Sequence, residues 1–142
     1  MNENQKLLSS ILETAQMGQI GIRAAMKANM KPSLRVNLQK QLRQYDMFEN
    51  SAHEIASTRC WEVHDIDPAA KFMAKATAKG KLSFGDVNSK IAAMMIQGNT
   101  RGMILACKNR NRCQKPDNQV FALADKMIEQ SEQNVQDMQP FL

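Results

Sequence analysis

Apolar residues recur every three or four positions through most of the chain, and this spacing predicts long amphipathic helices. The first covers residues 3–28, the second runs from residue 32 to about residue 61, the third covers 86–112 and the fourth covers 118–138. At 1.5 Å per residue, helices of this length are rods of roughly 30–40 Å, which is the scale of a helical bundle. The pattern therefore predicts an all-α fold, a four-helix bundle formed by residues 1–142 as one domain.

Proline and aspartate mark the breaks between these helices. Pro32 suits the start of the second helix, Asp117 follows Pro116 before the fourth, and Pro140 ends it. Residues 62–85 are too many for a simple turn between the second and third helices. Within them, Asp67 is a plausible N-cap with Pro68 at the first helical position, which predicts a short extra helix over residues 69–79. A connector of this length fits a bundle with one long crossover.

Composition agrees with helices and limits the classes of partner. Methionine is frequent at 11 residues and aromatics make up only 5%, while β-branched residues are scarce. The net charge of +5 is modest, and the basic residues at the end of the third helix are already favoured there by the helix dipole (Lys108, Arg110, Arg112 and Lys115). Nucleic acid is therefore not an expected partner.

The chain lacks the usual signs of export or membrane insertion. Its first residues, MNENQK, are polar, and no apolar run approaches the ~18 residues that span a bilayer. The three cysteines, Cys60, Cys107 and Cys113, are an odd number without a CxxC motif, which argues against a disulfide framework. We expect a cytoplasmic protein without a membrane partner.

Glycines in the middle of two helices suggest close helix contacts. Gly18 lies in the first helix, and Gly98 and Gly102 lie four residues apart in the third. A mid-helix glycine costs about 1 kcal/mol relative to alanine, which a close contact between helices can offset. The Gly98–Gly102 spacing predicts such a surface.

Three segments carry a family resemblance: residues 12–18 (LETAQMG), 96–102 (IQGNTRG) and 128–134 (IEQSEQN). With the two-plus-two order of helices, the chain resembles the ferritin-like superfamily, and more closely small uncharacterised bacterial ferritin-like proteins of the kind found in Firmicutes. The resemblance implies a four-helix bundle with a long crossover. Some members of the superfamily store iron, reduce peroxide or carry out oxygen chemistry.

The two-metal centre of that superfamily needs specific ligands at one level of the bundle. Two helices each supply an inward Glu and the other two each supply Glu-x-x-His. Helical phase instead places Gln19, Glu49, Asn99 and Ser131 at the inward polar positions. The Glu-x-x-His repeats are absent, since Ala52 follows three residues after Glu49 and His53 comes one residue later. The sequence therefore predicts a bundle without a complete di-metal site.

The inward position expected for Glu49 leaves two interpretations open, because an unpaired buried carboxylate is unfavourable. In the first, Glu49 belongs to a buried polar network with Gln19, Tyr45, Asn99 and Ser131. In the second, Glu49 and His53, with Asp46, bind a single divalent ion, with iron and manganese as the candidates.

Function follows from which interpretation holds. The first favours a structural or protein-interaction role over an enzymatic one, with a homo-oligomer (dimer or higher) or another protein as the partner. The alternative is a divalent-metal-binding oxidoreductase or a metal-storage protein that uses Glu49 and His53.

Overall fold

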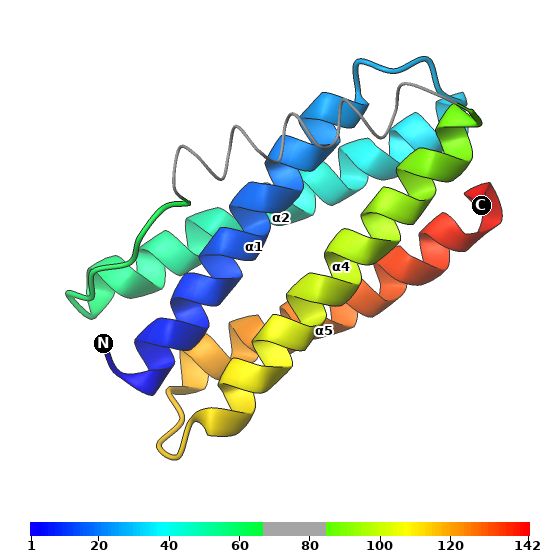
Figure 1. The fold of residues 1–142 in the computed structure, drawn as a ribbon. Helices are drawn as coiled ribbons and strands as arrows, with labels where there is room; N and C mark the ends of the chain where they lie inside the picture. Colours follow the sequence, from blue (N-terminus) through cyan, green and yellow to red (C-terminus); the bar gives the residue numbers. More distant parts are fainter. Residues whose placement is uncertain (67–84) are drawn as a thin grey trace.

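The computed structural model describes residues 1–66 and 85–142, and this part of the chain contains four α-helices, one short 3-10 helix and no strand (Figure 1). The helices are α1 (Glu3–Ala25), α2 (Pro32–Thr58), α4 (Val87–Arg112) and α5 (Asn118–Met138), and η1 (Gln139–Phe141) follows α5. The four expected long helices are present. The short helix expected over residues 69–79 and its expected N-cap Asp67 lie outside the described residues.

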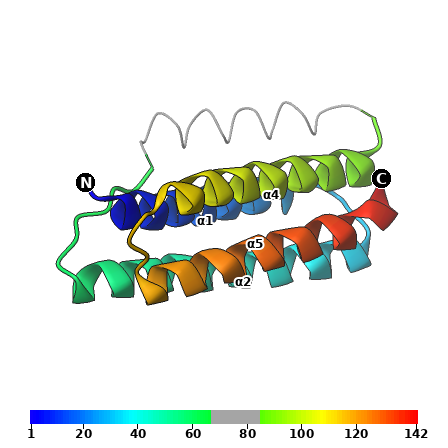
Figure 2. The same cartoon turned by 90° about the horizontal axis from the view of Figure 1, so that it is seen from below.

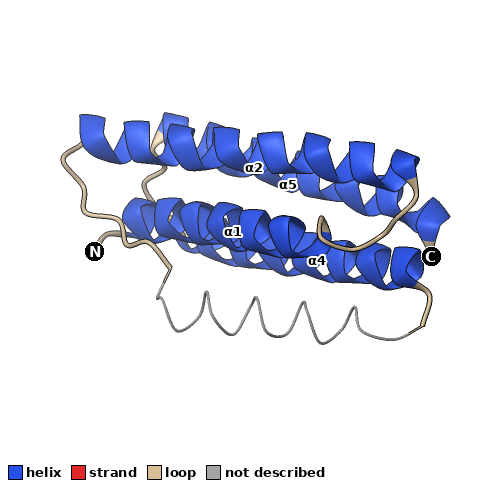
Figure 3. Cartoon of the chain, turned by 90° about the horizontal axis from the view of Figure 1, so that it is seen from above, coloured by secondary structure: helices blue, strands red, loops and turns tan. Residues whose placement is uncertain are grey.

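Two layers of two helices make up the bundle. Helices α1 and α4 form one layer, and α2 and α5 form the other (Figures 2 and 3). Helices α1 and α5 run in one direction, while α2 and α4 run in the opposite one (Figure 1). Helix α2 therefore ends at one end of the bundle and α4 begins at the other.

Side chain–backbone hydrogen bonds fix both ends of the bundle. At one end, the start of α1 meets the α4–α5 turn, because Asn4 donates to the carbonyl of Lys115 (2.8 Å) and accepts from the N–H of Asp117 (3.0 Å). At the other end, the N–H of Lys31 donates to Asn88 (2.8 Å). These bonds place the α1–α2 turn beside the start of α4.

Local caps explain where most helices begin. Asn2 and Gln5 form a capping box at α1, in which each side chain accepts from the other residue's N–H. Asp86 caps α4 through the N–H of Ser89, at 3.3 Å, and Pro32 occupies the first turn of α2. These signals are local in the sequence, and each helix begins at its expected residue or one residue later.

Helix α2 ends in a Schellman motif that contains a cysteine. The N–H of Trp61 donates to the carbonyl of Ala56 (2.9 Å), and the N–H of Cys60 donates to that of Ser57 (3.2 Å). Cys60 has a φ of 54°, in the left-handed region that this position usually fills with glycine. The motif turns the chain away from the helix three residues before the expected end at residue 61.

A continuous apolar core lies between the two layers. Its largest fully buried side chains come from all four helices: Leu7, Leu8, Ile11, Leu12, Ile22, Leu34, Leu38, Phe48, Ile91, Met127 and Met138. Within the α1–α4 layer, Gly102 lets α4 approach Thr14 of α1, because a Cβ on Gly102 would lie 2.5 Å from Thr14 Cγ2. Gly98 is exposed with nothing within 4 Å of its Cβ position, so the expectation that both glycines form the close surface is wrong.

Candidate functional site

A layer of uncharged polar side chains crosses the interior of the bundle, and we call Gln41, Tyr45, Asn99 and Asn134 the polar layer. Gln41 and Tyr45 come from α2, Asn99 from α4 and Asn134 from α5. All four are at most 6% exposed. The layer therefore links the two hairpins, α1–α2 and α4–α5, in the protein interior.

Asn99 is the centre of the polar layer. Its Oδ1 accepts from the Tyr45 hydroxyl (3.0 Å) and from Asn134 Nδ2 (3.1 Å). Its Nδ2 donates to the backbone carbonyl of Met95 (2.7 Å) and to Gln41 Oε1 (3.4 Å). The amide thus makes four hydrogen bonds, which satisfies both of its N–H groups and both lone pairs of its oxygen.

Burial keeps the phenol of Tyr45 neutral. Removal from water disfavours the phenolate, and this raises the pKa of Tyr45 to about 12. The hydroxyl therefore remains a hydrogen-bond donor to Asn99 at neutral pH. Nothing in the polar layer carries a formal charge under these conditions.

The expected network overlaps only in part with this arrangement. Tyr45 and Asn99 are hydrogen bonded, and Gln19 and Ser131 are buried on α1 and α5. Gln19 accepts from Arg23 Nη1 at 3.4 Å. Glu49 is only partly buried, so its expected inward position is wrong, and among the described residues no hydrogen bond joins it to the polar layer.

Gln41 and Asn134 are the members that sequence reasoning missed. A glutamine at position 41 reads as a surface residue, yet it is 1% exposed. Its partner Asn99 lies 58 positions away, so no pattern within α2 could reveal the bond. With Gln41 and Phe48 buried, the inward face of α2 turns away from Glu49.

The three candidate metal ligands on α2 do not converge. Asp46 and His53 are exposed, and Glu49 lies partly buried between them in sequence. In residues 1–66 and 85–142, no three His, Cys, Asp or Glu side chains are placed to hold a metal ion together. The donor set that the structure describes therefore does not fit the metal site that the sequence left open.

His53 lies instead beside Asp65, with 3.8 Å between His53 Nε2 and Asp65 Oδ1. The same carboxylate accepts from Gln16 Nε2 (2.6 Å), and Gln16 Oε1 accepts from the N–H of Ile66 (2.9 Å). These contacts attach the chain that follows α2 to the outer surface of α1. Within the described residues, the carboxylate beside His53 is thus an exposed one on the segment that follows α2.

Arg59 and Asp117 form an ion pair, which we call the charged clamp, at the end of the bundle where α2 stops. Arg59 donates through Nε and Nη2 to the two carboxylate oxygens of Asp117, the second bond measuring 3.1 Å. The Asp117 carboxylate also accepts from the N–H groups of Gln119 and Val120 at the start of α5. Burial alone would raise the pKa of Asp117, but Arg59 and the two N–H groups outweigh burial and lower it.

The basic residues at the end of α4 are partly occupied within the chain. The Arg110 guanidinium lies 2.6 Å from Asp125, measured from Nε to Oδ1, and 4.8 Å from the centre of the Phe121 ring. These contacts hold α4 against α5. They favour a structural explanation for Arg110 over phosphate binding.

All three cysteines are free.

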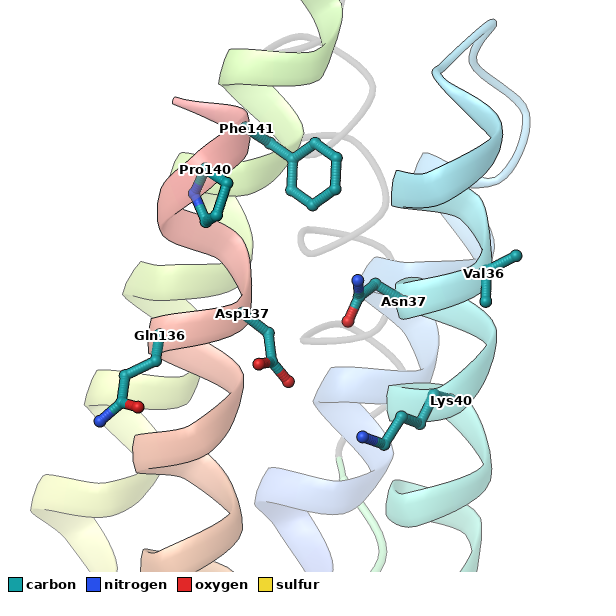
Figure 4. Close-up of a pocket in the computed structure, with 7 residues that line it drawn as sticks. All are labelled: Val36, Asn37, Lys40, Gln136, Asp137, Pro140 and Phe141. Atoms are coloured by element: carbon teal, nitrogen blue, oxygen red, sulfur yellow. The ribbon is translucent and has the colours of Figure 1, made fainter.

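Two open grooves lie on the layer formed by α2 and α5. The first groove is lined by Val36, Asn37, Lys40, Gln136, Asp137, Pro140 and Phe141. Figure 4 shows Asn37 and Lys40 of α2 and Asp137 of α5 projecting into the space between the two helices. The second groove is lined by Ser51, Glu54, Ile55, Thr58, Gln119, Ala122, Leu123 and Lys126.

Comparisons of the chain with protein-family models, with curated proteins and with solved structures gave no match. None of the helices in the described residues has an apolar stretch that could span a bilayer.

Proposed function

We propose that this protein is a ferritin-like four-helix bundle with a structural or protein-interaction role rather than an enzyme. The helix directions support the ferritin-like part of the proposal, because α2 and α4 run the same way and α1 and α5 run the opposite way. A bundle of this order needs one long crossover between its second and third long helices, as in ferritin-like folds.

The observation that carries the functional part is the chemistry of the polar layer. A di-metal centre in a helical bundle needs inward carboxylates and imidazoles from four helices at one level. Inside this bundle, Tyr45 and Asn134 instead both donate hydrogen bonds to Asn99. Neutral amides that are already paired with each other offer neither the charge nor the free oxygens that such ions require.

Surface features agree with a role in association. The α2–α5 layer carries two grooves, and α2 exposes apolar side chains on its outer side: Val36 is 62% exposed and Met47 is 39% exposed. Protein-binding surfaces combine exposed apolar groups with polar surroundings. A role that depends on surface contacts uses what this chain presents.

Elemental analysis of the purified protein tests the proposal against the metal-binding alternative. We expect no stoichiometric metal after purification, and no change in melting temperature when Fe²⁺ or Mn²⁺ is added in excess. A bound ion would stabilise the folded state in proportion to the logarithm of its concentration over its Kd. One or two ions per chain that are lost in Glu49→Ala, but retained in the control Glu54→Ala, would overturn the proposal in favour of a metalloprotein.

A further inference from the structure

The two grooves of the α2–α5 layer place opposite charges beside each other. Lys40 of α2 and Asp137 of α5 line the first groove, and Glu54 of α2 and Lys126 of α5 line the second. In the described residues, the ion pairs are formed elsewhere in the chain. Asp137 accepts only a side-chain amide bond there, from Gln133 at 2.9 Å. Four charges thus face solvent across the two grooves.

Charge is also segregated along the two helices. Over residues 31–45, α2 and its cap carry Lys31, Arg35, Lys40 and Arg43 and no acidic residue; over residues 46–58, α2 carries Asp46, Glu49 and Glu54 and no Lys or Arg. The last part of α5, residues 128–138, carries Glu129, Glu132 and Asp137 and no base. Because α2 and α5 run in opposite directions (Figure 1), the basic part of α2 lies level with the acidic part of α5.

We propose that the α2–α5 layer is the interface of a symmetric dimer with a second copy of this chain. The dimer's two-fold axis is parallel to the helices and lies in the interface between the copies, facing the space between α2 and α5 of each copy. Rotation about such an axis keeps each residue at its level and exchanges the two helices, so α2 of one copy lies on α5 of the other. Lys40 then faces Asp137 of the other copy, and Glu54 faces Lys126, each pair occurring twice.

This arrangement also covers the apolar groups on the same surface. Val36, Pro140 and Phe141 lie at the same end of this surface, so the rotation brings the part of α2 that carries the exposed Val36 onto the Pro140–Phe141 segment of the other copy. Apolar contact supplies affinity, while charge complementarity fixes orientation and excludes other pairings. The inference rests on the proposed role in association and names its partner.

Charge reversal in single and mixed variants tests the dimer by sedimentation equilibrium. Wild-type protein should dimerise, with a Kd that rises as NaCl is added. Lys40→Glu brings Glu against Asp137, and Asp137→Lys brings Lys against Lys40, so each variant alone should dimerise at least ~10-fold more weakly. The control Lys108→Glu, the same change at an exposed site on α4, should dimerise like wild type.

Mixing the two weakened variants gives the decisive result. In a heterodimer, Glu at position 40 faces Lys at position 137, and the native Lys40 faces the native Asp137, so association should return to within ~3-fold of wild type. Any repulsion within one chain persists in the mixture, so recovery must come from contacts between copies. Circular dichroism of each variant checks that it is folded.

A monomeric wild type overturns the dimer, as does a dimer that Lys40→Glu leaves unchanged or that the mixture fails to restore. Each of these results leaves the metal analysis, and with it the broader proposal of a non-enzymatic bundle, untouched. Stoichiometric metal in a protein that still passes the mixing test would instead overturn the broader proposal and leave the dimer in place.

Discussion

The ring of Tyr45 lies directly against the backbone of Gly18, so that a Cβ atom on Gly18 would be 2.5 Å from Tyr45 Cε2. Tyr45 cannot easily withdraw, because its ring is buried and its hydroxyl is bonded to Asn99. The absence of a side chain at position 18 thus lets α1 pack against the ring of Tyr45 while the Tyr45 hydroxyl bonds to Asn99 of the polar layer.

Alanine at position 18 should therefore destabilise the protein although alanine is the better helix former. We expect Gly18→Ala to lower the free energy of unfolding by about 1–3 kcal/mol through overpacking. Gly21, in the same helix, has nothing within 4 Å of its Cβ position. The control Gly21→Ala should raise stability by up to about 1 kcal/mol. Urea denaturation measures both, and equal effects at the two sites would contradict the close contact.

Tyr45 should titrate well above an ordinary tyrosine. It is the only tyrosine in the chain, so phenolate absorbance reports it alone. We expect a midpoint at about pH 12 in the folded protein and about pH 10 in urea. A titration at the ordinary value in folded protein would show that the hydroxyl is not buried.

The same shift makes stability depend on alkaline pH. The raised pKa means that the folded state holds the proton more tightly than the unfolded state. The contribution of the protonated Tyr45 hydroxyl to the free energy of unfolding is complete below the pKa of the unfolded state. It is lost as the pH rises through the pKa of the folded state, a change of about 3 kcal/mol. Tyr45→Phe, which has no proton to lose, should lack this part of the decline in urea unfolding at alkaline pH.

Asp117 should contribute more to the free energy of unfolding than Asp125, which is also paired with an arginine. Asp117→Ala removes both the cap of α5 and the partner of Arg59. The Asp117 side chain is 16% exposed and that of Arg59 is 24% exposed. We expect a loss of about 2–4 kcal/mol at neutral pH. Asp125→Ala breaks the more exposed Arg110 pair, at 55% and 36%, and should lower stability by no more than about 1 kcal/mol.

The pH dependence of the Asp117 effect has a defined direction. Because its folded pKa is lowered, its contribution is present above the ordinary aspartate pKa of about 3.9 and is lost as the pH falls through the lower folded value. Unfolding curves of wild type and Asp117→Ala should therefore converge in acid. Curves that stay equally far apart at low pH would rule out the charged clamp.

Glycine at position 60 should stabilise the end of α2. Cys60 holds a left-handed backbone conformation, with φ of 54°, which is unfavourable for a residue with a Cβ. We expect Cys60→Gly to raise the free energy of unfolding by about 1 kcal/mol and the melting temperature by a few degrees. Cys60→Ser keeps the Cβ and should show no such gain, so a matching rise there would point to loss of the thiol as the cause.

Helix boundaries followed from the sequence wherever their signals are local. Helix α5 spans the predicted residues, because Asp117 caps its start and Pro140 lies just beyond its end. The first helix was expected to reach residue 28 but ends at Ala25. There the carbonyls of Met26 and Ala28 accept from Arg35 of α2 (3.1 and 2.9 Å), a contact that only the folded hairpin creates.

The interior of the bundle was harder to predict, because burial of a polar residue depends on a partner in another helix. Asn99 is buried as the helical pattern predicts, but nothing local signals the burial of Gln41, and Phe48 rather than Glu49 takes the inward position. An error of one residue along a helix turns the side chain by about 100°. In this chain, the difference of one residue distinguishes an inward Glu49, which suggested a metal ligand, from the partly buried Glu49 of the structure.

The polar layer also fixes the alignment of the two hairpins along the bundle axis. Contacts among leucine and methionine tolerate displacement, because these side chains can repack. The bonds from Asn99 to Gln41 and Tyr45 cannot shift in the same way, since a slip of one helical turn, about 5.4 Å, would strand buried amides without partners. The alignment of the two hairpins that keeps these bonds is therefore lower in energy than alignments displaced by a helical turn.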